Sequence, residues 1–357
     1  MSIPTEEVAA PDSADSARIP RRQEASGGPL RVVFVIPGEP SGSSMIFARR
    51  QAESLREAGI QVVELFLASR TSPWRLLREL FRFRAALKTL QPDVVHAHFG
   101  TVTAAFAALA APSTPLVITY RGSDLNSTPG PFASRVRACA GRLLSQLAAL
   151  RASGIVCVSR RLAEQLWWRR NAVCVLPSGV DPEVFFPIPL AEARRQLGWH
   201  PGEHVVLFNA GHDARIKRLD LALAAAESAS RWVPGLRLEV LRGSTPPERM
   251  PLLMNASDCL LMTSDAEGSP TVIQEALAVN LPIVSVDVGD TRERLDGVAR
   301  TVIAPRDPDA LGLALARILS ERGRSEGRGR AGEFSSGYIT EQLTKLYNRC
   351  LQRSTPR

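Results

Sequence analysis

The stretch HVVLFNAGHDARIKRLDLAL, residues 204–223, combines an apolar run, a polar turn and the start of a segment with helical spacing. The run at 204–211 is typical of a strand in a parallel sheet that is covered on both faces. A helix is expected to begin near Leu219, so strand, turn and helix follow one another in close succession. This order is the repeating unit of α/β folds with parallel sheets.

The same unit recurs in both directions along the chain. Further apolar runs lie at 31–36, 61–68, 93–99, 115–120, 154–159 and 172–177, and at 236–243, 258–265 and 281–288. Segments with helical spacing separate them. The proline-rich stretch 177–189 has no clear period and is interpreted as a linker between the two series. We therefore expect an α/β protein with two doubly wound, Rossmann-like domains that face each other across a cleft.

These patterns divide the chain into four parts. Residues 1–29 are rich in Pro, Ser, Glu, Asp and Gly, and we expect them to form a disordered tail. We assign residues 30–180 to a first domain and residues 181–335 to a second. The last periodic segment, within 336–357, is expected to form a helix that can cross back to the first domain.

Composition narrows the class of protein. With 45% hydrophobic and 22% charged residues among 357, the chain is typical of a globular protein, which excludes collagen, a coiled coil and wholesale disorder. No apolar run reaches the ~20 residues of a spanning helix, and the N-terminus lacks the pattern of a secretory signal. The five cysteines lie singly, which argues against zinc knuckles and disulfide frameworks and fits a cytoplasmic location. The net charge of +8 permits an anionic partner, but no zinc-finger or RNP pattern indicates nucleic acid.

Ligands of open parallel sheets bind at the carboxyl ends of the strands, so the residues after each strand are the candidate site residues. The loop after strand 31–36 contains Gly38 and Gly42 and precedes a helix. It is either an anion-binding loop or an ordinary turn. It does not match GxGxxG, and no GxxxxGK[ST] motif occurs, which disfavours dinucleotide dehydrogenases and P-loop ATPases.

Two other strand ends of the first domain carry polar residues. His96 and His98 alternate along strand 93–99 and therefore point to one face. His98, at the strand end, is either a contact for a sugar or carbonyl or a core histidine, whereas His96 is expected in the core. No third ligand accompanies the pair, so no metal site is predicted. Arg121 and Asp124, in the RGSD stretch, form either a cap or a substrate contact.

The second domain has basic residues after its first strand. His212, Arg215, Lys217 and Arg218 lie just before a helix whose N-terminal dipole already disfavours positive charge. This placement favours binding of a phosphate, and a solvated basic face is the alternative.

The sharpest pattern is DAEGSPTVIQEA at residues 265–276. Ser269 is expected to cap the helix that follows and Pro270 to occupy its first position, which leaves Glu267 in the loop and Glu275 in the second turn. Two carboxylates with free backbone N–H groups between them can hold hydroxyl groups at the two ends of a ligand and an anion at its centre. Acid–base catalysis by this pair is disfavoured, because a spacing of roughly 10 Å exceeds one sugar-bond site.

The stretch Glu267-x7-Glu275, within EGSPTVIQEALAVNLPIVSVDVGD, resembles the EX7E signature of the retaining glycosyltransferases of family 4, which have the GT-B fold. Further matches lie at 38–43, at HAHFG 96–100, at RGSD 121–124, at PSGVD 177–181 and at KRLDLAL 217–223, so the resemblance covers about residues 31–350. It implies transfer of a sugar from a nucleotide diphosphate sugar with retention of anomeric configuration. It implies neither a metal nor a cofactor besides the donor substrate. The implied acceptor is a glycan or a lipid-linked saccharide, as in similar bacterial enzymes that assemble surface polysaccharides.

The resemblance also implies roles for individual residues. His98 would contact the donor sugar near its reactive centre, Glu267 would bind the donor hydroxyls, and Lys217 would neutralise the diphosphate. Glu275 would bind the ribose. The other implied donor-binding residues are Gly38, Gly42, Arg215, Gly268, Ser269, Pro270 and Thr271, and the implied sugar or acceptor contacts are Arg121, Asp124 and His212. His212 departs from the family pattern, which usually has arginine there, so that Arg215 or Arg218 would supply the charge.

Two other functions stay open at this point. A nucleotide-sugar epimerase or phosphorylase uses a related cleft, although no lysine suited to a pyridoxal Schiff base is evident. A non-catalytic nucleotide-sugar binder could serve as a partner in a membrane assembly, although the presence of His98, Lys217, Glu267 and Glu275 argues against a silent site.

Residues 73–90, PWRLLRELFRFRAALKTL, form a basic amphipathic segment with a net charge of +4. Its apolar residues at mainly helical spacing are Trp74, Leu77, Leu80, Phe81 and Leu87. Such a helix can lie on an anionic membrane, which would make the protein peripheral at the inner face of the plasma membrane. It can also be a crossover helix that packs on the sheet, and the two interpretations are compatible.

Overall fold

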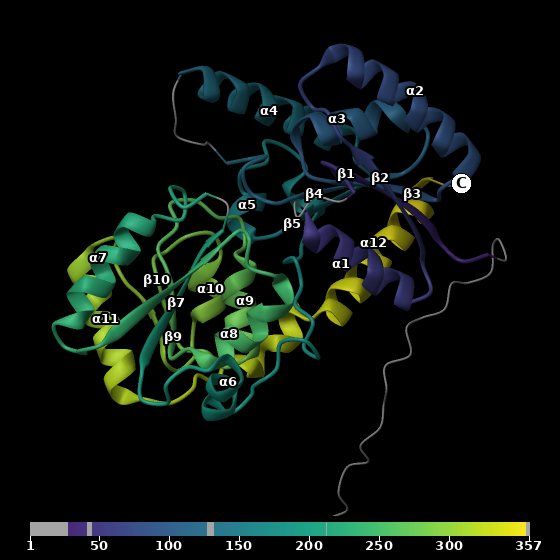
Figure 1. Cartoon of the computed structure of the whole chain (residues 1–357). Coiled ribbons are helices and arrows are strands. Elements are labelled where there is room, and N and C mark those ends of the chain that lie inside the picture. The colour runs from purple at the N-terminus through teal and green to yellow at the C-terminus, as the bar shows by residue number, and fades with distance from the viewer. Residues whose placement is uncertain (1–27, 41–44, 127–131, 212, 355–357) are drawn as a thin grey trace, which may run out of the picture.

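The computed structural model describes residues 28–40, 45–126, 132–211 and 213–354 and arranges them around two parallel sheets (Figure 1). Most of the tail 1–29, together with Gly42 and His212, lies outside the described residues. All strand pairings in both sheets are parallel. The α/β fold class predicted from the alternation of strands and helices is therefore confirmed.

The first sheet has six strands in the order β2–β1–β3–β4–β5–β6. Their bounds are β1 Arg31–Pro37, β2 Gln61–Leu67, β3 Val94–His98, β4 Leu116–Tyr120, β5 Gly154–Cys157 and β6 Val173–Val175. Each strand coincides with one of the apolar runs of the sequence. The central strands β3 and β4 are buried along their whole length, because helices cover both faces of the sheet.

Two helical layers cover the first sheet. Helices α2, α3 and α4 pack into the core on one face, and α1 and α12 pack into the core on the other. The bounds are α1 Ile46–Glu57, α2 Pro73–Leu90, α3 Thr101–Ala110, α4 Phe132–Arg151, α5 Arg160–Ala163, η1 Arg170–Ala172 and α12 Ser336–Ser354. Successive residues of β1 alternate between the two cores, with Val33 in one and Phe34 in the other, as the pleat of a strand requires.

The second sheet has five strands in the order β11–β10–β9–β7–β8. Its elements are α6 Leu190–Leu197, β7 His204–Gly211, α7 Leu219–Ser230, β8 Leu236–Arg242, η2 Pro247–Arg249, α8 Met250–Ala256, β9 Cys259–Met262, α9 Thr271–Ala278, β10 Ile283–Ser285, α10 Thr291–Leu295, β11 Thr301–Ile303, α11 Pro308–Glu321 and η3 Gly327–Phe334. The edge strand β11 was not among the predicted runs. Three residues are too few to show a period, so only the pairing with β10 identifies it.

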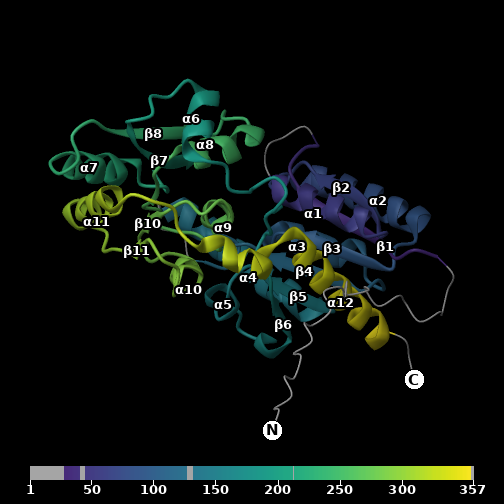
Figure 2. The same ribbon diagram turned by 90° about the horizontal axis from the view of Figure 1, so that it is seen from below.

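Two segments of the chain run between the domains, and they lie against each other. The Val180 N–H donates to the Phe334 carbonyl at 2.9 Å, and the Ser336 N–H donates to the Val180 carbonyl at 2.9 Å. Directly after this point α12 begins and extends along the first domain (Figure 2). Its Leu343 and Tyr347 are fully buried in the core beneath β1, so α12 packs into the first domain.

Candidate functional site

The loops after β7 and β9 are bound together at the carboxyl ends of neighbouring strands. The Thr263 hydroxyl donates to the Lys217 carbonyl at 2.8 Å, and the Asp265 N–H donates to the Ile216 carbonyl at 2.9 Å. These bonds bring the Lys217 Nζ to 2.5 Å from the Glu267 Oε1. Two predicted site residues that lie 50 positions apart in the sequence thus form one ion pair. Both side chains are partly exposed to solvent.

The other cations of this loop differ in their partners. Arg218 contacts Asp220 at 3.0 Å and Asp265 at 3.2 Å, so its charge is already compensated. Arg215 is exposed and, within the described part of the chain, forms no ion pair. Of the two candidates to supply a second positive charge to a ligand, Arg215 is therefore the one that is available.

The prediction that Ser269 caps α9 is wrong. Its hydroxyl instead donates to the Asp290 Oδ2 at 2.8 Å and accepts from the Gln274 Nε2 at 3.0 Å, because Asp290 offers a carboxylate after the adjacent strand. Pro270 precedes the first helical residue, Thr271, and makes no side-chain cap. The first N–H groups of α9 consequently have no side-chain cap and can bind an anion or a hydroxyl group of a ligand.

Asp290 is itself held in place by two neighbours. Arg294 donates to the same Oδ2 atom at 2.9 Å. Burial raises the pKa of Asp290, while Arg294 and the Ser269 hydroxyl lower it. This network fixes the loop that carries Gly268 and Ser269.

Glu275, in the second turn of α9, has a mostly buried carboxylate. Burial raises the pKa of Glu275 from 4.5 to about 7, and the cation of Arg50 opposes this shift. The Arg50 Nη1 is 3.9 Å from the Glu275 Oε1 and comes from α1 of the first domain. A partner that donates hydrogen bonds, such as a pair of sugar hydroxyls, would therefore find a carboxylate with little solvation to lose.

His98 lies at the end of β3 in the first domain, and Arg121 determines its chemistry. The Arg121 Nη2 is 3.1 Å from the His98 Nδ1. A guanidinium only donates, so Nδ1 must accept and the ring proton must lie on Nε2. Burial lowers the pKa of His98 well below its usual value, which keeps the ring neutral. Among the described residues the buried Nε2 has no hydrogen-bond partner, so His98 retains one donor.

Arg121 is held by the surrounding first-domain residues. Its guanidinium lies 3.8 Å from the centre of the Phe47 ring, and its Nη1 donates to the Ser178 hydroxyl at 3.0 Å. Arg121 therefore positions His98 as part of a packed unit, and its side chain is not a freely moving cation.

His96 and Asp124 have structural partners. The His96 Nδ1 is 2.7 Å from the Tyr347 hydroxyl, and its Nε2 is 2.7 Å from the Thr119 hydroxyl. The Asp124 carboxylate accepts the N–H groups of Gly100, Arg121 and Gly122 at 2.8–3.1 Å. This favours the cap over the substrate contact for Asp124. His96 lies in the core, stacked on His98 with ring centres 4.2 Å apart.

The two domains touch where glycines permit close approach. An ideal Cβ atom on Gly268 would lie 1.9 Å from the Arg121 carbonyl oxygen. On the other side Gly122 has φ +147°, a conformation that favours glycine, and its own Cβ position lies 3.2 Å from the Gly268 nitrogen. Arg160 and Glu293 add an ion pair at 3.3 Å. The loop carrying Glu267 thereby lies beside the loop carrying Arg121.

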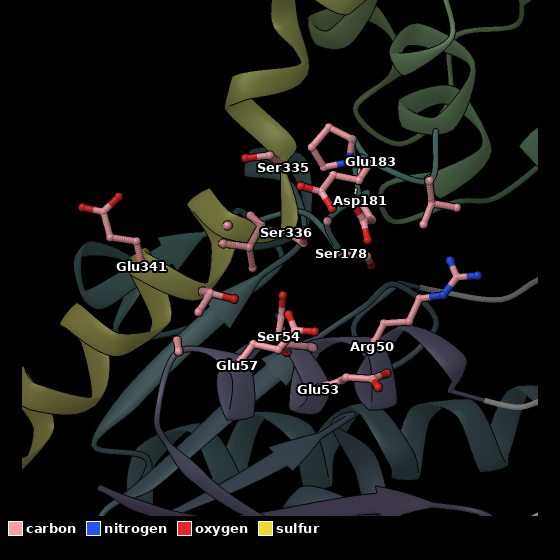
Figure 3. Close-up of a pocket in the computed structure, with 18 of the residues that line it drawn as sticks. Arg50, Glu53, Ser54, Glu57, Ser178, Asp181, Glu183, Ser335, Ser336 and Glu341 are labelled. Carbon is pink, nitrogen blue, oxygen red and sulfur yellow. Dashed lines mark hydrogen bonds between the residues drawn. The ribbon is translucent and has the colours of Figure 1, made fainter. Parts of the chain in front are cut away.

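A pocket of about 790 Å³ lies beside the linker that joins the two domains (Figure 3). It is formed by α1, the linker after Ser178 and the start of α12. Its lining carboxylates are Glu53, Glu57, Asp181, Glu183 and Glu341. This acidic lining disfavours a diphosphate, and of the site residues named above it includes Arg50 and Ser178.

Some site residues were missed by sequence reasoning, and one predicted residue is otherwise engaged. Asp290 follows β10, so the expectation that site residues come directly after strands could have identified it. Arg50 is one of three arginines on α1, and nothing in the sequence distinguishes it from the others. Gly38 has φ +110°, but its N–H donates to the Leu67 carbonyl at 3.0 Å and is not free for an anion.

Comparison with known proteins shows two family models that match this chain. The family model described as Glycosyltransferase Family 4 matches residues 43–184, and the model described as Glycosyl transferases group 1 matches residues 203–321. A similar curated protein is the putative teichuronic acid biosynthesis glycosyltransferase TuaC of Bacillus subtilis, 27% identical over 67% of this chain and 65% of that protein. Another is a GDP-mannose-dependent alpha-(1-6)-phosphatidylinositol monomannoside mannosyltransferase of Mycolicibacterium smegmatis, 27% identical over 44% of this chain and 50% of that protein. The chain thus spans less than two thirds of these relatives.

Solved structures show the same architecture. Sucrose-phosphate synthase of Thermosynechococcus elongatus matches with a TM-score of 0.71 at 17% identity, over 91% of this chain and 100% of that one. The Anabaena protein HepE, solved with UDP and glucose, matches with a TM-score of 0.64 at 16% identity, over 88% of this chain and 98% of that one. At such identities the likeness concerns the fold, which is of the two-domain GT-B type.

Proposed function

Because the chain belongs to glycosyltransferase family 4, we propose that it transfers a sugar from a nucleoside diphosphate sugar to a hydroxyl group of an acceptor, with retention of anomeric configuration. The observation that carries the proposal is the Lys217–Glu267 pair at 2.5 Å, set beside the first-domain loop of Arg121 through the Gly268 contact. Residues of both domains thus meet at the carboxyl ends of their sheets, where substrates of such folds bind.

The phosphate side of the proposed site is basic. Departure of the nucleoside diphosphate develops negative charge on the β-phosphate oxygens. Lys217, which also pairs with Glu267, the uncompensated Arg215 and the uncapped N–H groups of α9 supply positive charge and donors for it. Such preorganised groups in a site closed to water lower the barrier more than any other single contribution.

The sugar and ribose sides of the proposed site are acidic. Glu267, oriented by Lys217, accepts hydrogen bonds from hydroxyl groups of the donor sugar. The buried Glu275 accepts hydrogen bonds from the ribose hydroxyls. His98, neutral and protonated on Nε2, donates to the donor sugar near its reactive carbon. In this proposal the nucleotide would displace Arg50 from Glu275.

The reaction proposed is a same-face substitution. The bond between the anomeric carbon and the β-phosphate oxygen breaks, the acceptor oxygen bonds to that carbon from the same face, and the acceptor proton passes to the departing phosphate oxygen. None of the predicted residues then has to act as a catalytic base. No metal ion or further cofactor takes part in the proposed reaction.

The acceptor in this proposal is a glycan or a lipid-linked saccharide, used in polysaccharide or glycolipid biosynthesis at the cytoplasmic side of a membrane. The names of the two curated relatives support it, since one refers to a cell-wall polymer and the other to a phosphatidylinositol mannoside.

A donor screen tests the proposal. UDP-, GDP- and ADP-sugars are first compared by thermal shift, because a ligand that binds the folded state raises the unfolding midpoint. The binding donor is then incubated with protein, and the anomeric proton of the released or transferred sugar is followed by NMR. Slow donor hydrolysis with retained configuration, lost in Lys217→Ala, is expected. Release of an epimer or of a sugar 1-phosphate would indicate epimerase or phosphorylase instead, and binding without turnover would indicate a silent binder.

A further inference from the structure

The face of the first domain formed by α2, α3 and α4 is both basic and apolar, and the three helices lie together at the top of Figure 1. We call it the α2–α4 face. These helices contain nine cations and one carboxylate, Glu79. Their surplus of eight equals the net charge of +8 of the whole chain, so the rest of the chain is neutral in sum.

Helix α2 has two apolar sides. Phe83 and Leu87 are buried against the sheet, which is the crossover packing considered above. Trp74, Leu77 and Phe81 lie on the opposite side at i, i+3 and i+7 and face solvent, with Trp74 82% exposed. The five apolar residues predicted as one stripe are therefore divided: Leu80 and Leu87 pack on the core, and the other three do not.

Helix α4 repeats this arrangement over a greater length. Its exposed apolar residues, at i, i+7, i+11 and i+14, are Val136, Leu143, Leu147 and Leu150, and Leu109 of the adjacent α3 is exposed as well. Large apolar side chains on the outward side of a helix contribute nothing to the core that the helix covers. Contiguous patches of this kind mark interaction surfaces.

The cations flank the apolar rows and remain available. Within the described residues, Arg75, Arg78 and Lys88 of α2 and Arg135 and Arg137 of α4 form no ion pair, and all five are exposed. No described helix combines the length and apolarity needed to cross a bilayer.

We propose that the α2–α4 face docks on an anionic lipid bilayer, with its apolar rows in the interface and its cations at the head groups. Interfacial helices have this combination of an apolar stripe and flanking cations. A second copy of the chain fits poorly, because it would bring two faces of charge +8 together. Nucleic acid fits poorly, because phosphates offer no partner to eight exposed apolar side chains. The inference does not depend on the donor chemistry proposed above.

Vesicle co-sedimentation of the full chain tests the inference. The vesicles contain phosphatidylcholine alone or with 30 mol% phosphatidylglycerol, at low and at physiological salt. We expect binding to the anionic vesicles that is at least tenfold stronger than to neutral ones and falls steeply with salt. Trp74→Ser with Phe81→Ser, and separately Arg75→Glu with Arg78→Glu, should each lower the partition coefficient at least tenfold.

Matched controls lie on the second domain. Trp232→Ser with Leu313→Ser removes apolar side chains that are 68% and 61% exposed, and Arg249→Glu reverses an exposed charge. These variants should bind like wild type, and circular dichroism should show all variants folded. Equal recovery in the supernatant with and without anionic lipid would overturn the inference, as would equal losses in the control variants. A concentration-dependent doubling of mass abolished by Trp74→Ser, without vesicle binding, would assign the face to self-association instead.

Discussion

Replacement of Glu275 by glutamine is expected to stabilise the ligand-free fold while it weakens nucleotide binding. Burial raises the pKa of Glu275 from 4.5 to about 7. Each pKa unit corresponds to about 1.4 kcal/mol, so ionisation of this carboxyl in the folded protein costs about 3 kcal/mol more than in the unfolded chain. Because the folded state holds a proton that the unfolded state has lost, stability falls as the pH rises from about 4.5 through 7. Glutamine cannot ionise, so the free energy of unfolding of Glu275→Gln does not fall in this way as the pH rises.

The assay is urea unfolding followed by circular dichroism at pH 5 and pH 8.5. We expect Glu275→Gln to gain about 2 to 3 kcal/mol over wild type at the higher pH relative to the lower. The control is Glu227→Gln, which changes an exposed glutamate on α7 and should parallel wild type. Parallel pH dependence of wild type and Glu275→Gln would refute the reasoning. The same titration should raise the affinity of wild type for the donor nucleotide as the pH passes 7, because the ionised carboxylate accepts the ribose hydroxyls.

Three further substitutions test other contacts. Gly268→Ala places a methyl group on the Arg121 carbonyl and should lower kcat about a hundredfold without loss of nucleotide affinity; unchanged turnover would show that the domain contact is dispensable. Lys217→Ala should weaken binding of the nucleoside diphosphate about tenfold or more in calorimetry and leave the nucleoside unaffected, and equal effects on both would remove Lys217 from the phosphate site. Tyr347→Phe leaves the buried His96 without its 2.7 Å partner and should lower the free energy of unfolding by about 1 to 3 kcal/mol with normal turnover, whereas unaltered stability would mean that the bond contributes nothing.

The features that could be predicted from the sequence are those that depend on residues close together in the chain. Strands and helices follow from local periodicity, and the choice of Lys217 and Glu267 as site residues follows from their places after strands. Their ion pair was not predicted. The prediction that Ser269 caps α9 was wrong, because its hydroxyl donates to Asp290, which lies in another loop. The division of the apolar residues of α2 also depends on tertiary structure, since composition cannot distinguish an outward Trp74 from an inward Leu87.

The return of α12 to the first domain affects the order in which the protein can be completed during synthesis. Residues 181–335 emerge as one continuous stretch that contains every strand of the second sheet. The first domain emerges earlier, but its core beneath β1 lacks Leu343 and Tyr347 until α12 leaves the ribosome. The first domain is therefore completed only after the second, and a nascent chain stalled near residue 335 would hold a complete second domain beside an unfinished first one.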